Sequence, residues 1–291
     1  MWSIVAIPKA FKGEAKINQE NAIKSWTLLP FNPQIVLCGN DPGVKEYAQD
    51  HNLRYYPYLK YSEGGAPLLD SVFNSLEAIT GITQNVLFIN SDIILLQDFR
   101  NAILTSFTRR CIQIGQRRDL EVALPIPVGG DNWSPFLGHI VHSKGVLHGP
   151  SGLDFFFFPS DLDWKMPSFA LGRTAWDNWI PYRAKQLGLD IMDVTKEVTV
   201  VHPVHGYNHL PQGANQAWKG YDAEKNQILL GPRSHAFTTD HSDYVLTKKG
   251  FKRTVIHRRL FFGLKKWIAL HPRFEFLATI VDSVLKKAGR V

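Results

Sequence analysis

The sequence has little cysteine and no long apolar run. Its 291 residues include two cysteines, Cys38 and Cys111, which lie in or beside strand-like runs and have no metal-ligand spacing. This usage indicates a reducing compartment and two inert core thiols. No apolar run approaches the ~20 residues that a membrane-spanning helix needs. The first residues lack the basic and apolar regions of a signal peptide, so we expect a cytoplasmic protein.

Two nucleotide-binding fingerprints are also missing, and acidic residues are scarce near the C-terminus. We find neither Gly-x-Gly-x-x-Gly nor Gly-x-x-x-x-Gly-Lys-Ser/Thr, so the chain has neither a dinucleotide fingerprint nor a P-loop. Residues 245–291 hold 12 Lys and Arg against two acids, whereas residues 1–244 hold 21 against 24. The net charge of +7 therefore belongs to the tail. Because the body is slightly acidic and the tail has few interleaved aromatics, nucleic-acid binding is the least favoured function.

What is present is a regular alternation of strand-like and helix-like segments. We expect helices at 18–29, 44–52 and 68–79, and strands at 3–7, 35–38, 53–58 and from Val86 onward. Residues 125–150 are rich in Pro, Gly and His and are expected to form a loop. The succession predicts an α/β fold with a mostly parallel sheet flanked by helices on both faces.

The stretch from Val86 to Leu95 carries the strongest functional signal. Two apolar runs flank Asn90, Ser91 and Asp92, which places the three polar residues at the carboxyl end of a buried strand. Open α/β sheets bind ligands at that edge. Asp92 could hold a divalent metal and, through it, a diphosphate. The alternative is that Asp92 caps the following segment.

Other predicted strand ends offer polar groups to the same edge. A nucleotide would fit there, with Asp41 accepting from a base or ribose, a lysine neutralising a phosphate, and glycines allowing close backbone approach. The alternative for each lysine is a solvated surface charge. The residues that we assign to nucleotide-sugar binding at these ends are Pro8, Lys9, Lys12, Asn40, Asp41, Gly65 and Pro67.

Two further carboxylates flank later strands. Asp119 follows a strand at 111–115 and could face the sugar of a substrate, although a surface turn is equally compatible. Asp154 precedes four phenylalanines, residues 155–158, which predict a core strand. We expect Asp154 at the entry of that strand, pointing into the cleft.

The motif from Arg173 to Ala184 predicts the start of a helix with a carboxylate in its first turn. Asp177 is a candidate general base there, and Trp176 could stack on a sugar ring. The alternatives are a dipole-stabilised surface aspartate and a core tryptophan. Arg173, in the same motif, joins Asp154 and Asp177 as a catalytic candidate.

A histidine-rich run and a basic tail complete the chain. His202, His205 and His209 follow a strand, and we expect one of them to complete a metal site begun by Asp92. Residues 210–244 are expected to form a mobile loop or lid. On a helical wheel, one face of the tail is apolar (Ile256, Leu260, Leu264, Trp267) and the other is basic (Arg258, Arg259, Lys265, Lys266), with a second such segment from Phe274 to Leu285. This pattern predicts contact with an anionic membrane surface, or a helix packed on the domain's own sheet with its basic face solvated.

Seven motifs occur in order over residues 3–209: Ile7-Pro8, Gly65-Ala66-Pro67-Leu68, Phe88 to Leu95, Ile114 to Leu120, Pro150 to Asp154, Gly172 to Trp179 and His202 to His209. Taken together, they resemble a group of bacterial GT-A glycosyltransferase-like proteins. The resemblance implies a GT-A fold, a nucleotide-diphospho-sugar donor and usually a divalent metal, Mn or Mg, on an Asp-x-Asp motif. By resemblance, Asn90 and Asp92 occupy that motif, Asp177 matches the base and His202 a late metal ligand; Asn90 stands where the family has Asp.

The sequence thus predicts a catalytic domain at 1–209, a lid at 210–244 and a basic amphipathic helical tail at 245–291. The leading hypothesis is a glycosyltransferase that moves a sugar from a nucleotide-diphospho-sugar to a hydroxyl of a saccharide or lipid-linked acceptor, working in the cytoplasm and at the inner membrane face. The alternative is an inactive module of the same fold that binds sugar or a membrane surface.

Overall fold

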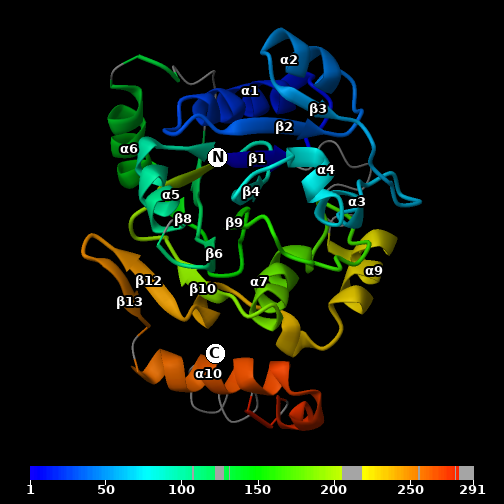
Figure 1. Cartoon of the computed structure of the whole chain (residues 1–291), viewed down its shortest axis with the longest axis vertical. Coiled ribbons are helices and arrows are strands. Elements are labelled where there is room, and N and C mark those ends of the chain that lie inside the picture. The colour runs from blue at the N-terminus through cyan, green and yellow to red at the C-terminus, as the bar shows by residue number, and fades with distance from the viewer. Residues whose placement is uncertain are drawn as a thin grey trace.

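The computed structural model describes residues 1–106, 108–121, 128–130, 132–204, 218–254, 256–278 and 280–281, with the backbone alone for 256–261. Within these ranges the chain builds one large sheet, a small second sheet and flanking helices (Figure 1).

The large sheet has nine strands in the order β13-β12-β10-β6-β9-β4-β1-β2-β3. All neighbours pair in parallel except those of β9 and the terminal β13, so the predicted mostly parallel sheet is confirmed. Its strands are β1 (Trp2–Ala6), β2 (Gln34–Cys38), β3 (Arg54–Tyr56), β4 (Asn85–Ile89), β6 (Cys111–Ile114), β9 (Phe155–Pro159), β10 (Asp190–Asp193), β12 (Tyr244–Thr247) and β13 (Gly250–Arg253).

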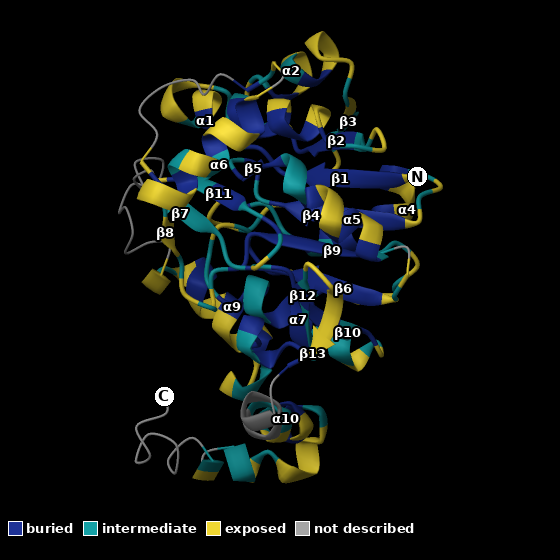
Figure 2. Cartoon of the chain, turned by 90° about the vertical axis from the view of Figure 1, so that its left-hand side faces the viewer, coloured by how far each residue is buried: buried dark blue, intermediate teal, exposed yellow. Residues whose placement is uncertain are grey.

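The central strands are buried on both faces, which is why their sequences are continuous apolar runs (Figure 2). In β9, Phe155 and Phe157 belong to one core cluster, and Phe156 and Phe158 belong to the other. This alternation is the two-residue period of a strand, so each pair of rings packs under a different layer of helices.

Helices cover both faces, as predicted. One core cluster lies under α1 (Gly13–Thr27), α2 (Val44–Asp50), α5 (Arg100–Ser106) and α6 (Trp133–Lys144). The other lies under α3 (Asp70–Phe73), α4 (Leu76–Thr80), α7 (Trp176–Gln186) and α9 (Tyr221–Leu230). A second sheet, in the order β5-β11-β7-β8, joins β5 (Ile94–Leu95), β11 (Val200–Pro203), β7 (Arg118–Leu120) and β8 (Val146–Leu147). Short 3₁₀ turns are η1 (Gln97–Phe99), η2 (Arg233–His235), η3 (Thr239–His241) and η4 (Pro272–Phe274).

Two local expectations are wrong. The single helix expected at 68–79 is two helices, α3 and α4. The break falls at Asn74, whose side chain forms two hydrogen bonds with the backbone of Met166, at 3.1 and 2.9 Å. Within the expected loop at 125–150, the chain forms α6, whose residues Trp133, Leu137 and Val141 recur every four positions and are buried.

The described residues after 217 contain more secondary structure than expected, and some of them belong to the large sheet. The described part of 210–244 contains α9, η2 and η3 rather than a bare loop, and residues 205–217 lie outside the described residues. The expected boundary before residue 245 cuts through β12, which pairs in parallel with β10 through Tyr244 and Met192. The large sheet therefore continues into the tail, and α10 (Ile256–Leu270) and the described residues 271–278 and 280–281 lie outside it.

The topology places the candidate residues at one edge. Strands β1, β2, β4 and β6 run in parallel through the sheet, so their carboxyl ends share an edge. Because β9 runs antiparallel between β4 and β6, its first residues lie at that same edge. Asp154, just before β9, is therefore a neighbour of the residues that follow β4 and β6.

Candidate active site

The Asn90 turn and Asp154 are joined by two hydrogen bonds. The backbone N–H of Asn90 donates to the carbonyl of Asp154 at 2.9 Å, and Asn90 Nδ2 donates to Asp154 Oδ1 at 2.7 Å. The turn closes when Ile93 N–H donates to the Asn90 carbonyl at 3.1 Å. Two residues that are 64 positions apart in sequence are thus held together where β4 ends and β9 begins.

Arg117 connects Asp154 with Asp119. It follows β6, and its Nη1 donates to Asp154 Oδ2 at 2.7 Å while its Nε donates to Asp119 Oδ1 at 2.8 Å. The Arg117 side chain is 18% exposed, so these charge-assisted bonds are only weakly screened by water. One guanidinium therefore fixes two carboxylates that sequence reasoning placed at separate strand ends.

Asp119 also holds two histidines. His148 Nδ1 lies 2.7 Å from Asp119 Oδ2, and His202 Nδ1 lies 3.2 Å from Asp119 Oδ1. The register of the small sheet explains this, because β7 pairs with both β8 and β11 and sets His202 opposite Asp119. Burial works against ionisation, but the hydrogen bonds from His202, His148 and Arg117 hold the pKa of Asp119 well below its usual range.

Asp177 stands beside this network at the start of α7. The preceding Ala175 has φ = 84°, a left-handed conformation that is costly for a residue with a Cβ and that marks a constrained position. Asn178, the next residue, donates through its Nδ2 to the Ser151 carbonyl at 3.1 Å, which ties the helix start to the segment before β9. Burial, together with the charge of the neighbouring Asp154 carboxylate, raises the pKa of Asp177 from 3.8 to about 7, against a smaller opposing effect of Arg117.

Along the same edge, Gln19 of α1 joins the ends of β1 and β4. Its Oε1 accepts from Lys9 N–H at 2.6 Å and from Ser91 Oγ at 3.1 Å, and its Nε2 donates to the Lys9 carbonyl at 3.1 Å. The loop that carries Pro8 and Lys9 is therefore fixed next to the Asn90–Asp92 turn.

A third group lies at the β2 end. Tyr61 Oη donates to Asn40 Oδ1 at 2.7 Å and accepts from Asn40 N–H at 3.4 Å. Burial raises the pKa of the neighbouring Asp41. Gly65 and Pro67 belong to the turn after Tyr61, where Gly65 has φ = 77° and a Cβ would meet no atom within 4 Å. In strand order, the three groups run from β2 through β1 and β4 to β9 and β6.

Three predicted site residues lie elsewhere or face the solvent. Arg173 forms an ion pair with Asp222 of α9, with 3.9 Å between Nη2 and Oδ2, and the two side chains are 6% and 5% exposed. Trp176 is 4% exposed and packs edge-on against Phe88 and Phe156, so it is a core residue without a free ring face for a sugar. Lys12 is exposed at the start of α1.

The described donors do not by themselves form a divalent metal site. Within the described ranges, no group of three or more His, Cys, Asp or Glu side chains is arranged to hold a metal ion. The amide of Asn90 is engaged with Asp154, and His202 contacts Asp119. His205 and His209 lie outside the described residues. The ligand set of Asn90, Asp92 and His202 stays a prediction.

A cavity beside the sheet borders this network. It has a volume of about 430 Å³ and is lined by residues that include Gln116 and Arg118. Gln116 Nε2 donates to the His148 carbonyl at 2.6 Å. Arg118 is the residue before Asp119 in β7. Another cavity, of about 480 Å³, is at the opposite end of the strands, beside Asn85 at the start of β4 and Pro159 at the end of β9.

Sequence reasoning missed the residues that connect these groups. Arg117, His148, Gln19 and Tyr61 each bridge segments that are far apart in the chain. Arg117 has a usable signal, because an arginine two residues before Asp119 follows a strand whose end was already identified. Nothing local marks the other three.

Comparison with known proteins gives matches in structure only. No protein-family model matches the chain, and no curated protein matches its sequence. S. aureus TarS 1–349 in complex with UDP-GlcNAc is 12% identical at a TM-score of 0.47, over 70% of this chain and 58% of that one. GalNAc-T7 with UDP, GalNAc and Mn²⁺ is 14% identical at 0.46, over 76% and 44%. Glucosyl-3-phosphoglycerate synthase from Mycobacterium tuberculosis, in complex with Mn²⁺, UDP and phosphoglyceric acid, is 16% identical at 0.45, over 79% and 77%.

The expected resemblance to GT-A-type proteins is confirmed as a resemblance in chain arrangement. The chain spans 36% to 60% of the length of the TarS structures that it resembles. With every one of these TM-scores below 0.5, the likeness gives no information on substrate or family membership, and function has to be argued from the site itself.

Proposed function

We propose that this protein is a glycosyltransferase that moves a sugar from a nucleotide-diphospho-sugar donor to a hydroxyl of a saccharide or lipid-linked acceptor. The observation that carries the proposal is the carboxylate pair at the carboxyl edge of the sheet. Both oxygens of Asp154 are bound, by Asn90 and Arg117, whereas its neighbour Asp177 has a pKa raised to about 7. Two neighbouring carboxylates in such different environments are typical of acid–base sites.

The order of polar groups along the edge supports the placement of the donor. Asn40, Asp41 and Tyr61 would bind the nucleoside, and the Lys9 loop with the Asn90 turn would hold the diphosphate. The sugar would then lie against Asp154 and the Asp119–His148 pair. Lys12, which is exposed beside this edge, would add positive charge for the phosphates.

Asp177 would act as the general base. Its ionised carboxylate would take the proton of the acceptor hydroxyl while that oxygen forms a bond to the anomeric carbon of the donor sugar. The bond from the anomeric carbon to the diphosphate oxygen breaks, and the nucleoside diphosphate leaves with the electron pair. Because a base works best with a pKa near the working pH, a value of about 7 fits this role better than the ordinary 3.8.

The test combines donor binding with one substitution. Calorimetry with a panel of UDP-, GDP- and CDP-sugars, with and without Mn²⁺, should identify a donor, and release of nucleoside diphosphate should report turnover. Asp177→Asn is expected to lower kcat by about 10²–10⁴ and to leave the donor Kd nearly unchanged. Asp163→Asn, a change at a carboxylate that is 72% exposed, serves as the matched control. The proposal fails if no donor binds or if Asp177→Asn turns over like the unmodified protein.

An inactive sugar-binding module is the second candidate, and the engagement of Asn90 with Asp154 favours it. The amide of Asn90 donates to Asp154 instead of lying free at the position where an Asp-x-Asp motif has a carboxylate. In that case, donors would bind but neither transfer nor slow hydrolysis would exceed the rate of the Asp177→Asn variant.

A further inference from the structure

Helix α10 turns part of its apolar stripe outward. On the face shared by Leu264 and Trp267, these side chains are 47% and 42% exposed. Lys266, which the helical wheel assigns to the basic face, is instead 8% exposed and points into the protein. A helix packed on its own domain would bury the apolar stripe and leave its lysines in water, so this arrangement reverses that expectation.

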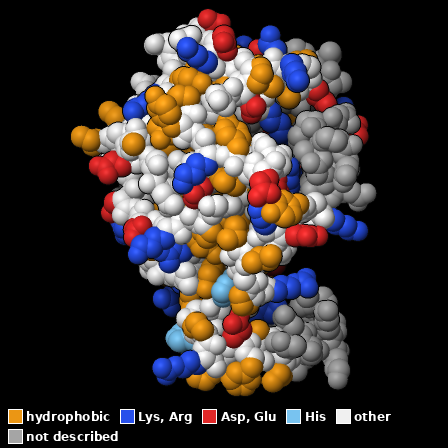
Figure 3. All heavy atoms as spheres, turned by 90° about the vertical axis from the view of Figure 1, so that its right-hand side faces the viewer, with side chains coloured by type: hydrophobic (Ala, Val, Ile, Leu, Met, Phe, Trp, Pro, Cys, Tyr) orange, Lys and Arg blue, Asp and Glu red, His pale blue; other side chains and the backbone are white. Residues whose placement is uncertain are grey.

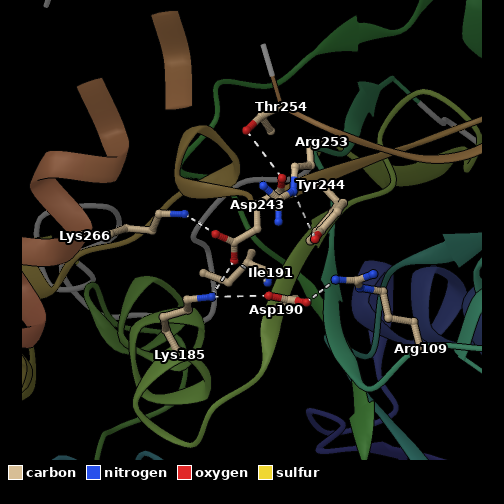
Figure 4. A network of polar contacts seen from close by, with 9 residues as sticks. All are labelled: Arg109, Lys185, Asp190, Ile191, Asp243, Tyr244, Arg253, Thr254 and Lys266. Carbon is tan, nitrogen blue, oxygen red and sulfur yellow. Dashed lines mark hydrogen bonds and ion pairs between the residues drawn. The ribbon is translucent and has the colours of Figure 1, made fainter. Parts of the chain in front are cut away.

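A network of ion pairs fixes the helix in this orientation (Figure 4). Lys266 Nζ pairs with Asp243 Oδ1, and Lys185 of α7 contacts Asp243 Oδ2 at 2.9 Å. Asp243 Oδ2 also accepts from the backbone N–H of Ile191 in β10 at 3.0 Å. Ile268 and Ala269, which are 1% and 3% exposed, add apolar contacts on the buried side. The outward position of Leu264 and Trp267 is therefore built into the packing.

The apolar surface continues past the helix. Trp267 stacks on His271 at 4.6 Å and lies 4.8 Å from the ring of Phe274. Phe276 and Ile280 are 67% and 55% exposed. Hydrophobic side chains line the end of the molecule where α10 lies, at the bottom of Figure 3. We call Leu264, Trp267, Phe274, Phe276 and Ile280 the α10 face.

Exposed positive charge accompanies this face on the same segment of the chain. Lys248, Lys249 and Lys252 on the β12–β13 hairpin are exposed, as is Arg273 beside Phe274. Residues 245–291 carry 12 Lys and Arg against two acids, whereas the rest of the chain is slightly acidic. Exposed aromatic and aliphatic side chains with a surplus of cations on one segment match the chemistry of an anionic bilayer, where rings enter the headgroup region and lysines meet lipid phosphates.

We propose that the α10 face is a membrane-docking surface that binds anionic phospholipid bilayers. The contact is peripheral, made by side chains of the α10 face. Among the described residues, no helix is long and apolar enough to cross a membrane. Docking does not depend on the function proposed above, because it requires neither donor nor turnover.

Vesicle co-sedimentation of the full chain tests the proposal. We expect the protein to sediment with phosphatidylcholine vesicles that contain about one third phosphatidylglycerol, much less with phosphatidylcholine alone, and less as salt is raised. Leu264→Ser with Trp267→Ser should weaken binding by about tenfold or more, because both side chains would enter the bilayer. The matched control is Ile82→Ser with Ile228→Ser, two residues that are 97% and 77% exposed elsewhere.

A second variant tests the charge separately from the apolar contacts. Changing Lys248, Lys249 and Lys252 to glutamate alters exposed positions only and should weaken the preference for phosphatidylglycerol, because the charge of residues 245–291 falls from +10 to +4. The proposal is wrong if phosphatidylglycerol vesicles do not bind the protein or if the Leu264–Trp267 variant binds them normally. It is also wrong if light scattering shows a dimer that this variant converts to a monomer, since the face would then join two copies of the chain.

Discussion

Two clusters of aspartates, one at the carboxyl edge of the sheet and one beneath α10, differ in their balance of charge. Beneath α10, Asp243 and Asp190 share three cations: Lys185, Lys266 and Arg109. At the edge, Asp119 and Asp154 pair with one permanent cation among the described residues, Arg117, whose charge also acts on Asp177.

The two clusters therefore shift the pKa of an aspartate in opposite directions. Burial opposes ionisation of Asp243, but Lys266, the Ile191 N–H and Lys185 outweigh it and lower its pKa. Asp177 has burial and a like-charged neighbour, so its pKa rises to about 7. A balanced cluster is suited to hold elements together, whereas an unbalanced one keeps a group that can exchange protons near neutral pH.

The largest expected effect is on the structural side of this comparison. Asp243→Ala leaves Lys266 buried without its carboxylate, whereas Lys185, 23% exposed, keeps Asp190 at 3.5 Å. We expect a loss of about 3–5 kcal/mol in the free energy of unfolding. Asp163→Ala, which breaks an exposed pair with Lys165, should cost about 0–1 kcal/mol. Urea unfolding of both variants measures the difference. Equal losses would mean that the Asp243 network does not hold α10 and the hairpin to the body.

The next effect concerns the catalytic side and its pH dependence. If the ionised form of Asp177 is the base, kcat/KM should rise about tenfold per pH unit well below pH 7 and level off above it, a change of about fiftyfold from pH 5 to pH 7. Donor turnover across this range gives the profile, and Asp177→Asn should flatten it. A flat profile in the unmodified protein would remove Asp177 from the role of base.

Strong local patterns are what made part of the site predictable. Asn90 and Asp119 follow apolar strands, so the rule of carboxyl strand ends was enough to group them. Asp154 precedes its strand and Asp177 opens a helix. These two reach the same edge because β9 runs antiparallel and because Asn178 binds the segment before β9. The rest depends on contacts between distant segments. The break at Asn74, the pairing of His148 with Asp119 and the burial of Lys266 are all set by tertiary packing that no local window contains.

Two misjudged segments show how composition hides structure. The Gly, Pro and His content of 125–150 concealed α6, although its buried residues keep a helical period. The basic charge of the tail concealed β12, which completes the sheet beside β10. The position of Trp176 at the start of a helix was compatible with a place in the core or in the cleft. Its ring lies in the core because it packs against Phe88 and Phe156.

A smaller effect should appear in the stability of Asp177→Asn. The raised pKa means that the folded protein holds a proton that the unfolded chain releases from about pH 4, so native Asp177 costs stability as the pH rises from 3.8 to about 7. The asparagine variant removes this cost and should gain about 1–3 kcal/mol by pH 7, with no further gain above it. Thermal unfolding at pH 4, 6 and 8 measures this. A loss of stability at pH 8 would show that the ionised carboxylate has partners that offset its burial.

The smallest effect is on donor affinity alone, and it distinguishes the nucleotide-binding end of the edge from the end where the sugar would react. Tyr61→Phe removes the hydroxyl that donates to Asn40 Oδ1 at 2.7 Å, so Asn40 loses its orientation. We expect donor affinity to fall by about 1 kcal/mol, or roughly fivefold, with kcat unchanged, because the anomeric carbon and Asp177 lie at the other end. Tyr58→Phe, at a ring that is 76% exposed, is the control. A fall in kcat with unchanged affinity would instead place Tyr61 at the reacting sugar, and the proposed direction of the donor along the edge would have to be reversed.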